Sequence, residues 1–226
     1  MKKTVCLFCL SILVFSCTIP RYSYVPPALN NIPYSRAGEG QLAVQFGSVG
    51  MAARGGIAVT KNINLNAWVG AMPSDTGYNG KESEFSIGVQ TNPDHKAVSS
   101  FYLGYANGSN KKIKTGLSGH YSRSFFQWQH GGFDLGNGPV QFDAYVGLRI
   151  NYLDYEGTKG GARFFDHLFY YEPYFGGAVG GKNVRFQLTT GMALKNSGEW
   201  GEGVRIFPFF MNVGVVVKIR KGNAAK

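Results

Sequence analysis

The chain has 226 residues, of which 16% are charged and 15% aromatic, with 32 glycines and a formal net charge of +10. The charged fraction lies below the roughly 25% typical of soluble domains, and the slightly negative mean hydropathy is too low for a bundle of membrane-spanning helices. Such a composition is typical of membrane β-barrels, because half of each spanning strand is polar.

The first segment, residues 1–16, predicts a signal peptide. Lys2 and Lys3 form a basic start, and the apolar run that follows is shorter than the ~20 residues that a membrane-spanning helix needs. The run ends at Val14-Phe15-Ser16-Cys17, which resembles the lipobox of bacterial lipoproteins. The resemblance implies cleavage before Cys17 and a covalent lipid on this cysteine. An ordinary signal peptide with an incidental cysteine is the alternative.

The position of the cysteines supports this interpretation. Cys6, Cys9 and Cys17 are the three cysteines of the chain, so the mature protein would keep one, in acylated form. A disulfide, thiol catalysis and a cysteine-based metal site would then be excluded. Removal of Lys2 and Lys3 would lower the net charge from +10 to +8.

Residues 17–39 predict an extended tether, and residues 40–220 a β-barrel. Four prolines in the tether disfavour helix and favour polyproline-like geometry. From residue 40 onward, apolar and polar residues alternate as in strands with one face in lipid and one in a lumen. The clearest segment is 140–155, where every even position up to Tyr152 is apolar. Residues 221–226 form a basic tail.

The alternation predicts ten strands, an even number as in single-chain bacterial barrels. Segments 51–60 and 120–135 are the least regular, so the strand count stays open between eight and twelve. The predicted strands are residues 41–48, 51–60, 62–72, 82–90, 97–106, 120–135, 140–155, 165–180, 183–194 and 206–219.

The connections predict the orientation of an all-β, antiparallel, up-and-down transmembrane barrel. They are short after every second strand, and longer at residues 73–81, 107–114, 156–164 and 195–205. In outer-membrane barrels the short turns are periplasmic. Both ends of the barrel would then lie on the periplasmic side, where a lipid on Cys17 would also lie.

The chain resembles a family of Bacteroidota outer-membrane β-barrel lipoproteins. The resembling residues are 24–26 (Y-V-P), 31–33 (N-I-P), 38–42 (G-E-G-Q-L), 148–155 (L-R-I-N-Y-L-D-Y), 171–173 (Y-E-P), 184–188 (V-R-F-Q-L) and 209–219. The resemblance implies a fold and an outer-membrane location, and no activity. Surface-directed lipoproteins of this group carry an acidic cluster after the cysteine. None follows Cys17, which favours an anchor in the periplasmic leaflet.

Several charged residues fall on the polar face of the predicted strands and therefore point into the lumen. They are Glu84, Asp143, Arg149, Glu172 and Arg185, with Arg54 as a further candidate. An unpaired charge in a narrow interior costs several kcal/mol, so we expect these charges to pair. A selective conduit for a small ion or solute is the alternative. About eight strands are filled by side chains, whereas 16 to 18 leave a channel, so ten favour the paired network.

Catalytic and metal-binding motifs are weak. His120 lies near Ser122 and Ser124, which invites comparison with barrel enzymes that deacylate lipid A by Ser and His. However, no G-x-S-x-G element and no informatively spaced acid accompany them. His95 falls in a predicted turn and His167 near a loop end. No H-E-x-x-H, C-x-x-C or calcium-loop spacing occurs. We therefore expect no enzymatic activity, no metal and no cofactor besides the lipid.

The basic charge indicates anionic partners. A secreted, lipidated chain does not meet nucleic acid. Lipopolysaccharide phosphates are the nearest anions to Lys111, Lys112 and Lys114, which lie in a predicted outer loop. Aromatic residues at the predicted strand ends are expected to form girdles at the membrane interface: Tyr152, Tyr155, Phe164, Phe165, Tyr170 and Trp200.

The sequence therefore predicts an outer-membrane β-barrel lipoprotein anchored on the periplasmic side. Its expected role is structural or interactive in the cell envelope, as an accessory to a transport or secretion complex. A narrow porin-like channel is one alternative. The other is a soluble, lipid-anchored lipocalin-like barrel whose apolar faces surround an apolar ligand.

Overall fold

The structure, a computed structural model, describes residues 33–47, 50–72, 78–91, 95–112, 116–136, 138–195, 204, 206 and 208–219. The predicted signal peptide, Cys17 and Trp200 lie outside these residues. Among the described residues, no helix is long and apolar enough to cross a membrane.

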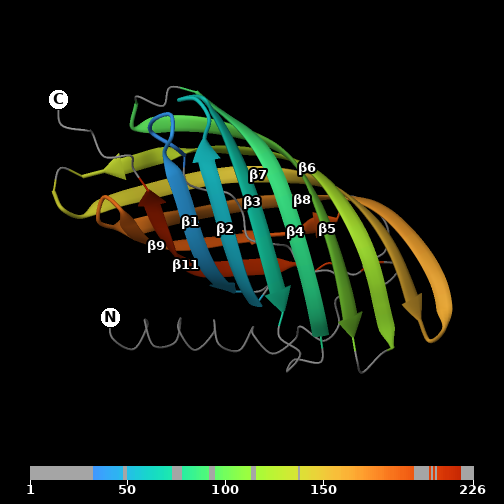
Figure 1. The fold of residues 1–226 in the computed structure, drawn as a ribbon. Helices are drawn as coiled ribbons and strands as arrows, with labels where there is room; N and C mark the ends of the chain where they lie inside the picture. Colours follow the sequence, from blue (N-terminus) through green and yellow to red (C-terminus); the bar gives the residue numbers. More distant parts are fainter. Residues whose placement is uncertain are drawn as a thin grey trace, which may run out of the picture.

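The described residues form one closed antiparallel sheet (Figure 1). Its strands are β1 (Gly40–Gly47), β2 (Gly50–Ala58), β3 (Ile63–Met72), β4 (Tyr78–Thr91), β5 (Ala97–Lys112), β6 (Leu117–Leu135), β7 (Gln141–Lys159), β8 (Ala162–Gly180), β9 (Val184–Met192), β10 (Leu194–Lys195) and β11 (Phe209–Ile219). β10 is a two-residue continuation of β9. The wall therefore has ten strands, which confirms the predicted up-and-down barrel.

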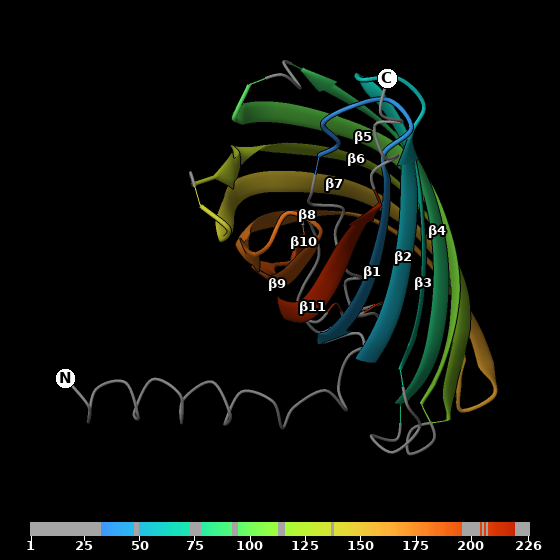
Figure 2. The same ribbon diagram turned by 60° about the vertical axis from the view of Figure 1, so that its left-hand side comes forward.

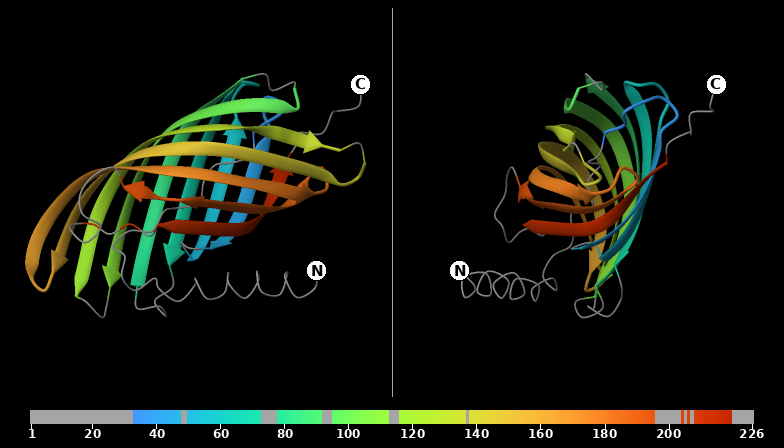
Figure 3. Two further views of the ribbon diagram at one scale, coloured as in Figure 1. Left: turned by 180° about the vertical axis from the view of Figure 1, so that it is seen from behind. Right: turned by 90° about the vertical axis from the view of Figure 1, so that its left-hand side faces the viewer.

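Closure depends on the last long strand. β11 pairs with β1 on one side and with β9 on the other, and β9 pairs with β8. Each remaining strand pairs with its neighbour in sequence. In the described residues, β8 is paired on both sides from Tyr170 onward, and only its projecting part, residues 162–169, is paired on one side alone. Closure otherwise removes the strand edges that an open sheet would expose. Figure 3 shows the wall from behind and from the side.

Apolar side chains point outward and polar ones inward. Phe142 and Val213 are 51% and 47% exposed, whereas Asp143 and Arg149 are 4% and 0% exposed. The period of two along a strand produces this division, because successive side chains point to opposite faces. The soluble lipocalin-like alternative is therefore wrong, since it requires the apolar faces inside.

Glycines make room for aromatic rings inside the barrel. At several inward-facing glycines, a side chain would collide with a ring. The pairs are Gly70 with Trp68, Gly88 with Tyr102, Gly104 with Phe125, Gly108 with Tyr121, Gly119 with Tyr155, Gly147 with Tyr174, Gly176 with Tyr145 and Gly191 with Phe210. The large rings thus lie flat over glycine backbone and fill a narrow lumen.

The two ends of the barrel differ (Figures 1 and 2). We call the end at which residues 33–39 lie the tether end. At this end Gly38 and Glu39 join the end of β2 by backbone hydrogen bonds to Ala58 of 2.8 and 2.9 Å. The opposite end, where β7 turns into β8, is the hairpin end. Strands β5 to β8 project there beyond the rest of the wall.

The connections expected at residues 107–114 and 156–164 are shorter than predicted. β5 and β6 stay paired up to Lys112 and Leu117, and β7 and β8 up to Lys159 and Ala162. The tight turn between β7 and β8 consists of Gly160 and Gly161, whose φ angles are 58° and 89°. Glycine adopts this left-handed conformation without steric cost, so the hairpin needs no loop.

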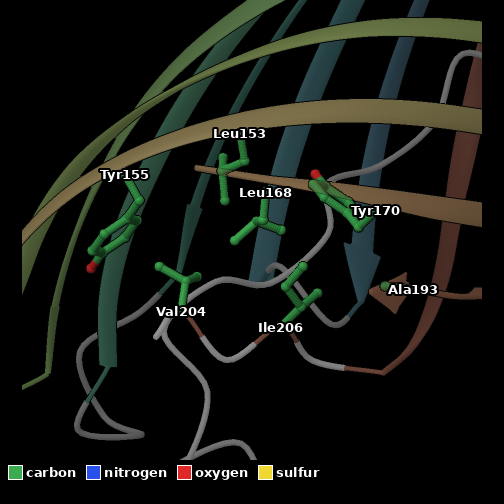
Figure 4. Close-up of a cluster of buried hydrophobic side chains, with 7 residues drawn as sticks. All are labelled: Leu153, Tyr155, Leu168, Tyr170, Ala193, Val204 and Ile206. Atoms are coloured by element: carbon green, nitrogen blue, oxygen red, sulfur yellow. The ribbon is translucent and has the colours of Figure 1, made fainter. Parts of the chain in front are cut away.

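An apolar cluster closes the hairpin end from within (Figure 4). Val204 and Ile206, from the connection between β10 and β11, pack inside the wall of β7 and β8. The backbone nitrogen of Val204 donates to Asp166 Oδ2 at 2.6 Å. The other members of the cluster are Leu153, Tyr155, Leu168, Tyr170 and Ala193.

Candidate functional site

The centre of the lumen is organised around Arg123 of β6. Its Nη2 atom lies 2.6 Å from Glu82 Oε1 and 2.7 Å from Glu84 Oε2, both on β4. Its Nη1 atom donates to Asn151 Oδ1 at 2.9 Å. Arg123 is fully buried. One guanidinium therefore holds two carboxylates from a strand that is not its neighbour in the wall.

Arg149 of β7 extends this cluster. It donates to Glu84 Oε2 at 3.1 Å and to Gln127 Oε1 at 2.7 Å. Its guanidinium carbon lies 4.2 Å from the centre of the Phe125 ring, a cation–π distance. Glu172 lies opposite Arg149 on β8 and accepts a hydrogen bond of 3.2 Å from Asn151 Nδ2.

A second cluster lies nearer the tether end. Arg185 of β9 donates to Asp143 Oδ2 at 2.6 Å and also pairs with Asp134. Asp134 in turn lies 3.3 Å from Lys218 Nζ of β11. Because β6 and β11 lie far apart around the wall, the contact between Asp134 and Lys218 reaches across the lumen.

A β-bulge gives Asp134 its position. The register between β6 and β7 shifts between Gly132 and Leu135, and Asp134 has a φ of 53°. In a regular strand, Asp134 would point outward together with Trp128. A bulge re-aims a side chain, and aspartate tolerates positive φ better than most residues. The carboxylate therefore reaches Arg185 inside.

The tether end is filled by Tyr34. Its hydroxyl donates to Asn66 Oδ1 at 2.8 Å, and its backbone nitrogen donates to Gln90 Oε1 at 3.0 Å. Burial raises the pKa of the Tyr34 hydroxyl above its usual value. Part of the predicted tether is thus bound into the mouth of the barrel.

All five predicted lumen residues, and Arg54, lie in the interior. Sequence reasoning missed Glu82, Arg123, Asp134 and Lys218. Glu82, Arg123 and Lys218 lie inside the predicted strands 82–90, 120–135 and 206–219, on their polar faces. Applying the alternation to every charged residue of these strands would therefore have found them. Asp134 gave no such signal, because the bulge reverses its direction.

Two other predictions need correction. Lys112 is a buried side chain of β5 and Lys111 an exposed one, so they do not lie together in an outer loop; Lys114 is outside the described residues. Tyr155 and Tyr170 belong to the inner apolar cluster and do not form part of an outer girdle. Side chains alternate along β5, β7 and β8, which continue farther than predicted. The exposed Phe165 and the half-buried Tyr152 do lie on the outside.

The described residues contain no group of three or more His, Cys, Asp or Glu side chains that could hold a metal ion. The interior instead joins acids and bases through short, buried contacts. A paired network of this kind ties strands together and occupies the lumen.

A closed antiparallel barrel with an apolar exterior and an ion-paired interior is the structure of an outer-membrane β-barrel protein. No protein-family model and no curated protein sequence matches the chain. Two solved structures that it resembles are also outer-membrane barrels. The translocator domain of autotransporter NalP from Neisseria meningitidis has a TM-score of 0.39 and 11% identity, over 80% of this chain and 86% of that one.

The second is LpxR from Salmonella typhimurium, with a TM-score of 0.42 and 12% identity over 86% of this chain and 79% of that one. LpxR is an outer-membrane lipid A deacylase, and this finding contradicts the prediction that the chain has no enzymatic activity, since that prediction does not follow from the barrel fold. At such low identity the likeness concerns the fold alone. Neither structure assigns an activity to this chain.

Proposed function

We propose that the protein is a lipid-anchored component of the outer membrane whose closed barrel serves an envelope assembly. The observation that carries the proposal is the division of the wall into an apolar exterior and an ion-paired, filled interior. The apolar exterior can contact the hydrocarbon of the bilayer. The filled, ion-paired interior stabilises the barrel and leaves little space for a solute to pass. An accessory role in a transport or secretion complex is consistent with this division.

The orientation of the barrel in the membrane is inferred from the lengths of the turns at its two ends. The chain enters the barrel at the tether end, where the turns between β2 and β3 and between β8 and β9 are short. We infer that this end faces the periplasm, with Cys17 lipidated in the adjoining leaflet. The projecting hairpin end then faces the exterior. The resemblance to Bacteroidota barrel lipoproteins agrees with this arrangement and stays a prediction.

Fractionation tests the membrane insertion and the anchor separately. Replacement of Cys17 by Ala should abolish incorporation of labelled palmitate, yet the protein should still require detergent for extraction. Release of this variant into buffer would contradict an integral barrel. Retention of the label would contradict lipidation at Cys17.

Cysteine labelling tests the orientation. In the wild-type background, where cleavage would remove Cys6 and Cys9 and the lipid would block Cys17, an Ala162→Cys variant at the hairpin end should react in intact cells with a maleimide that does not cross membranes. A Gly138→Cys variant in the tether-end turn between β6 and β7 is the matched control and should react only after lysis. The opposite labelling pattern would reverse the orientation.

A further inference from the structure

A cleft of about 420 Å³ lies at the hairpin end, lined by residues of β5 to β8. Its lining includes several side chains of the kinds used in acyl transfer: His120, Ser122, Asp154, Glu156 and His167. None of these side chains is buried. They alternate with the inward-facing residues of β6 to β8, so the cleft opens on the outer surface, away from the lumen.

The register of the strands places these side chains in two adjacent rows. Ser122 lies opposite Asp154, and Asp154 opposite His167. In the next row toward the hairpin tip, His120 lies opposite Glu156. Directly opposed residues have Cβ atoms ~4.5–5.5 Å apart, and residues two apart on one strand are ~6.6 Å apart. An imidazole can therefore connect Ser122 to Glu156.

Asp154 already has a partner. Its carboxylate forms a short contact with His167 Nδ1. Glu156 is thus the carboxylate that faces His120. On the other side of Ser122, Asn107 of β5 is directly opposite, and its Oδ1 accepts a hydrogen bond of 3.1 Å from the Tyr105 hydroxyl. This bond leaves the amide NH₂ of Asn107 to act as a donor beside Ser122.

The cleft lies where the outer surface changes from apolar to polar. We call the exposed apolar surface between the two ends of the barrel the membrane band. The row next to Ser122 on the side of this band contains Tyr105, Tyr152 and Phe169. Aromatic residues of this kind mark the membrane interface of barrels. In a lipid, the ester bonds that join acyl chains to the headgroup lie at this interface.

Cationic residues lie beyond the cleft. Lys81 is in the same row as His120, and Lys111 and Arg163 are in the following row toward the hairpin tip. All three are exposed on the outer surface. From the membrane band outward, the order is therefore aromatic, then Ser, His and acid, then cation. This order matches the acyl chain, ester and phosphate of a membrane lipid.

We propose that this cleft is a serine ester hydrolase site that removes an acyl chain from a phosphorylated lipid in the leaflet at the hairpin end. Ser122 is the nucleophile, His120 the general base and Glu156 the residue that positions His120. Asn107 donates to the oxyanion, and Lys81, Lys111 and Arg163 bind the phosphate. That this leaflet is the outer one rests on the proposed orientation.

The reaction follows the general serine mechanism in two steps. Ser122 Oγ bonds to the ester carbonyl carbon as its proton passes to His120, and the bond to the alcohol oxygen then breaks as His120 returns the proton to that oxygen. Water next attacks the acyl-serine while giving a proton to His120. The proton returns to Ser122 Oγ as the fatty acid leaves. Overall, one ester and one water give one acid and one alcohol.

The test measures fatty acid release by the purified full-length protein reconstituted in vesicles. One set of vesicles contains ester-linked glycerophospholipid and a second also contains lipopolysaccharide, so the two sources of substrate are distinguished. We expect release from at least one of them, reduced at least ~100-fold by Ser122→Ala and by His120→Asn. A fluorophosphonate probe should attach to Ser122, as located by mass spectrometry.

Ser124→Ala is the matched control, because Ser124 is the next outward residue of β6 toward the membrane band. It should release fatty acid at the wild-type rate. Glu156→Gln should lower kcat with little change in KM and shift the pH profile, whereas Glu156→Asp should restore part of the rate. A Glu156 with only a structural role would leave the pH profile unchanged.

The proposal is overturned if neither lipid is cleaved above the level of Ser122→Ala and the probe does not label Ser122. Equal rates for the Ser122→Ala variant and the wild type would also overturn it. Heat-dependent mobility on gels should show that each variant forms the same barrel, so loss of the fold is distinguished from loss of chemistry. The labelling of Ala162→Cys in cells tests the orientation independently.

Discussion

At the scale of single residues, the interior depends on a few arginines that each hold more than one acid. Arg123 lies between Glu82 and Glu84, with contacts of 2.6 and 2.7 Å. Two carboxylates on the same face of one strand repel each other in a poorly hydrated interior. The guanidinium offsets this repulsion, so its removal leaves two buried acids without their shared partner.

We expect Arg123→Met to lower the free energy of unfolding by about 3–5 kcal/mol, because breaking a buried ion pair leaves uncompensated charge. Urea unfolding in detergent micelles, followed by tryptophan fluorescence, measures the change. Arg163→Met is the control, since Arg163 is exposed. A loss in Arg123→Met no larger than in the control would show that the central pairs do not stabilise the barrel.

Glycines beneath aromatic rings form a second residue-scale feature. At Gly104, an added Cβ would collide with the ring of Phe125 and lie 2.8 Å from the backbone oxygen of Phe85. Gly104→Ala should therefore destabilise the barrel by about 1–3 kcal/mol, the usual cost of overpacking. Gly55→Ala is the matched control, because its Cβ would lie 3.5 Å from Leu42 in ordinary contact. Equal unfolding midpoints for the two variants would contradict this packing.

At the scale of elements, the connection between β10 and β11 acts as an apolar plug. Val204 and Ile206 are buried against Leu168 and Tyr170. The long strands β7 and β8 provide the wall on which they pack. Their contacts hold the hairpin end closed while the outer face of the same hairpin stays accessible.

Ile206→Ala should lower the free energy of unfolding by about 2–5 kcal/mol, because it removes a buried side chain and leaves a cavity. Val59→Ala provides the comparison, since Val59 is exposed at the tether end. Hydrogen exchange should also show faster opening of β8 near Leu168 in Ile206→Ala only. Unchanged exchange there would mean that the connection does not hold the hairpin.

At the scale of the whole molecule, three layers fill the barrel along its axis. Tyr34 occupies the tether end, the charge clusters occupy the centre, and the cluster around Ile206 occupies the hairpin end. The contact between Asp134 and Lys218 reaches across the lumen. This arrangement favours a closed barrel over a narrow pore.

The purified protein should therefore show no discrete conductance steps in planar lipid bilayers at physiological salt. A general porin reconstituted in parallel provides the positive control. Regular steps that disappear when Tyr34 is replaced by Trp would instead support the channel alternative and identify the tether end as its gate.

The sequence by itself determined the barrel, its outward apolar face and the inward direction of Glu84, Asp143 and Arg149. The period of two is a local property of each strand, so it can be read without knowing which strands meet. Glu82 and Arg123 were also within reach of this reasoning.

Only the tertiary structure decided which charges pair and where polar residues gather outside. Arg123 meets Glu82 because the register of β4, β5 and β6 lets the two inward side chains meet over the intervening strand β5, and a bulge turns Asp134 inward. The alignment of Ser122 with Asp154 likewise depends on the pairing of β6 with β7, which are joined through a turn far from both residues. Alternation fixes the side of the wall that a residue occupies, whereas register fixes its neighbours.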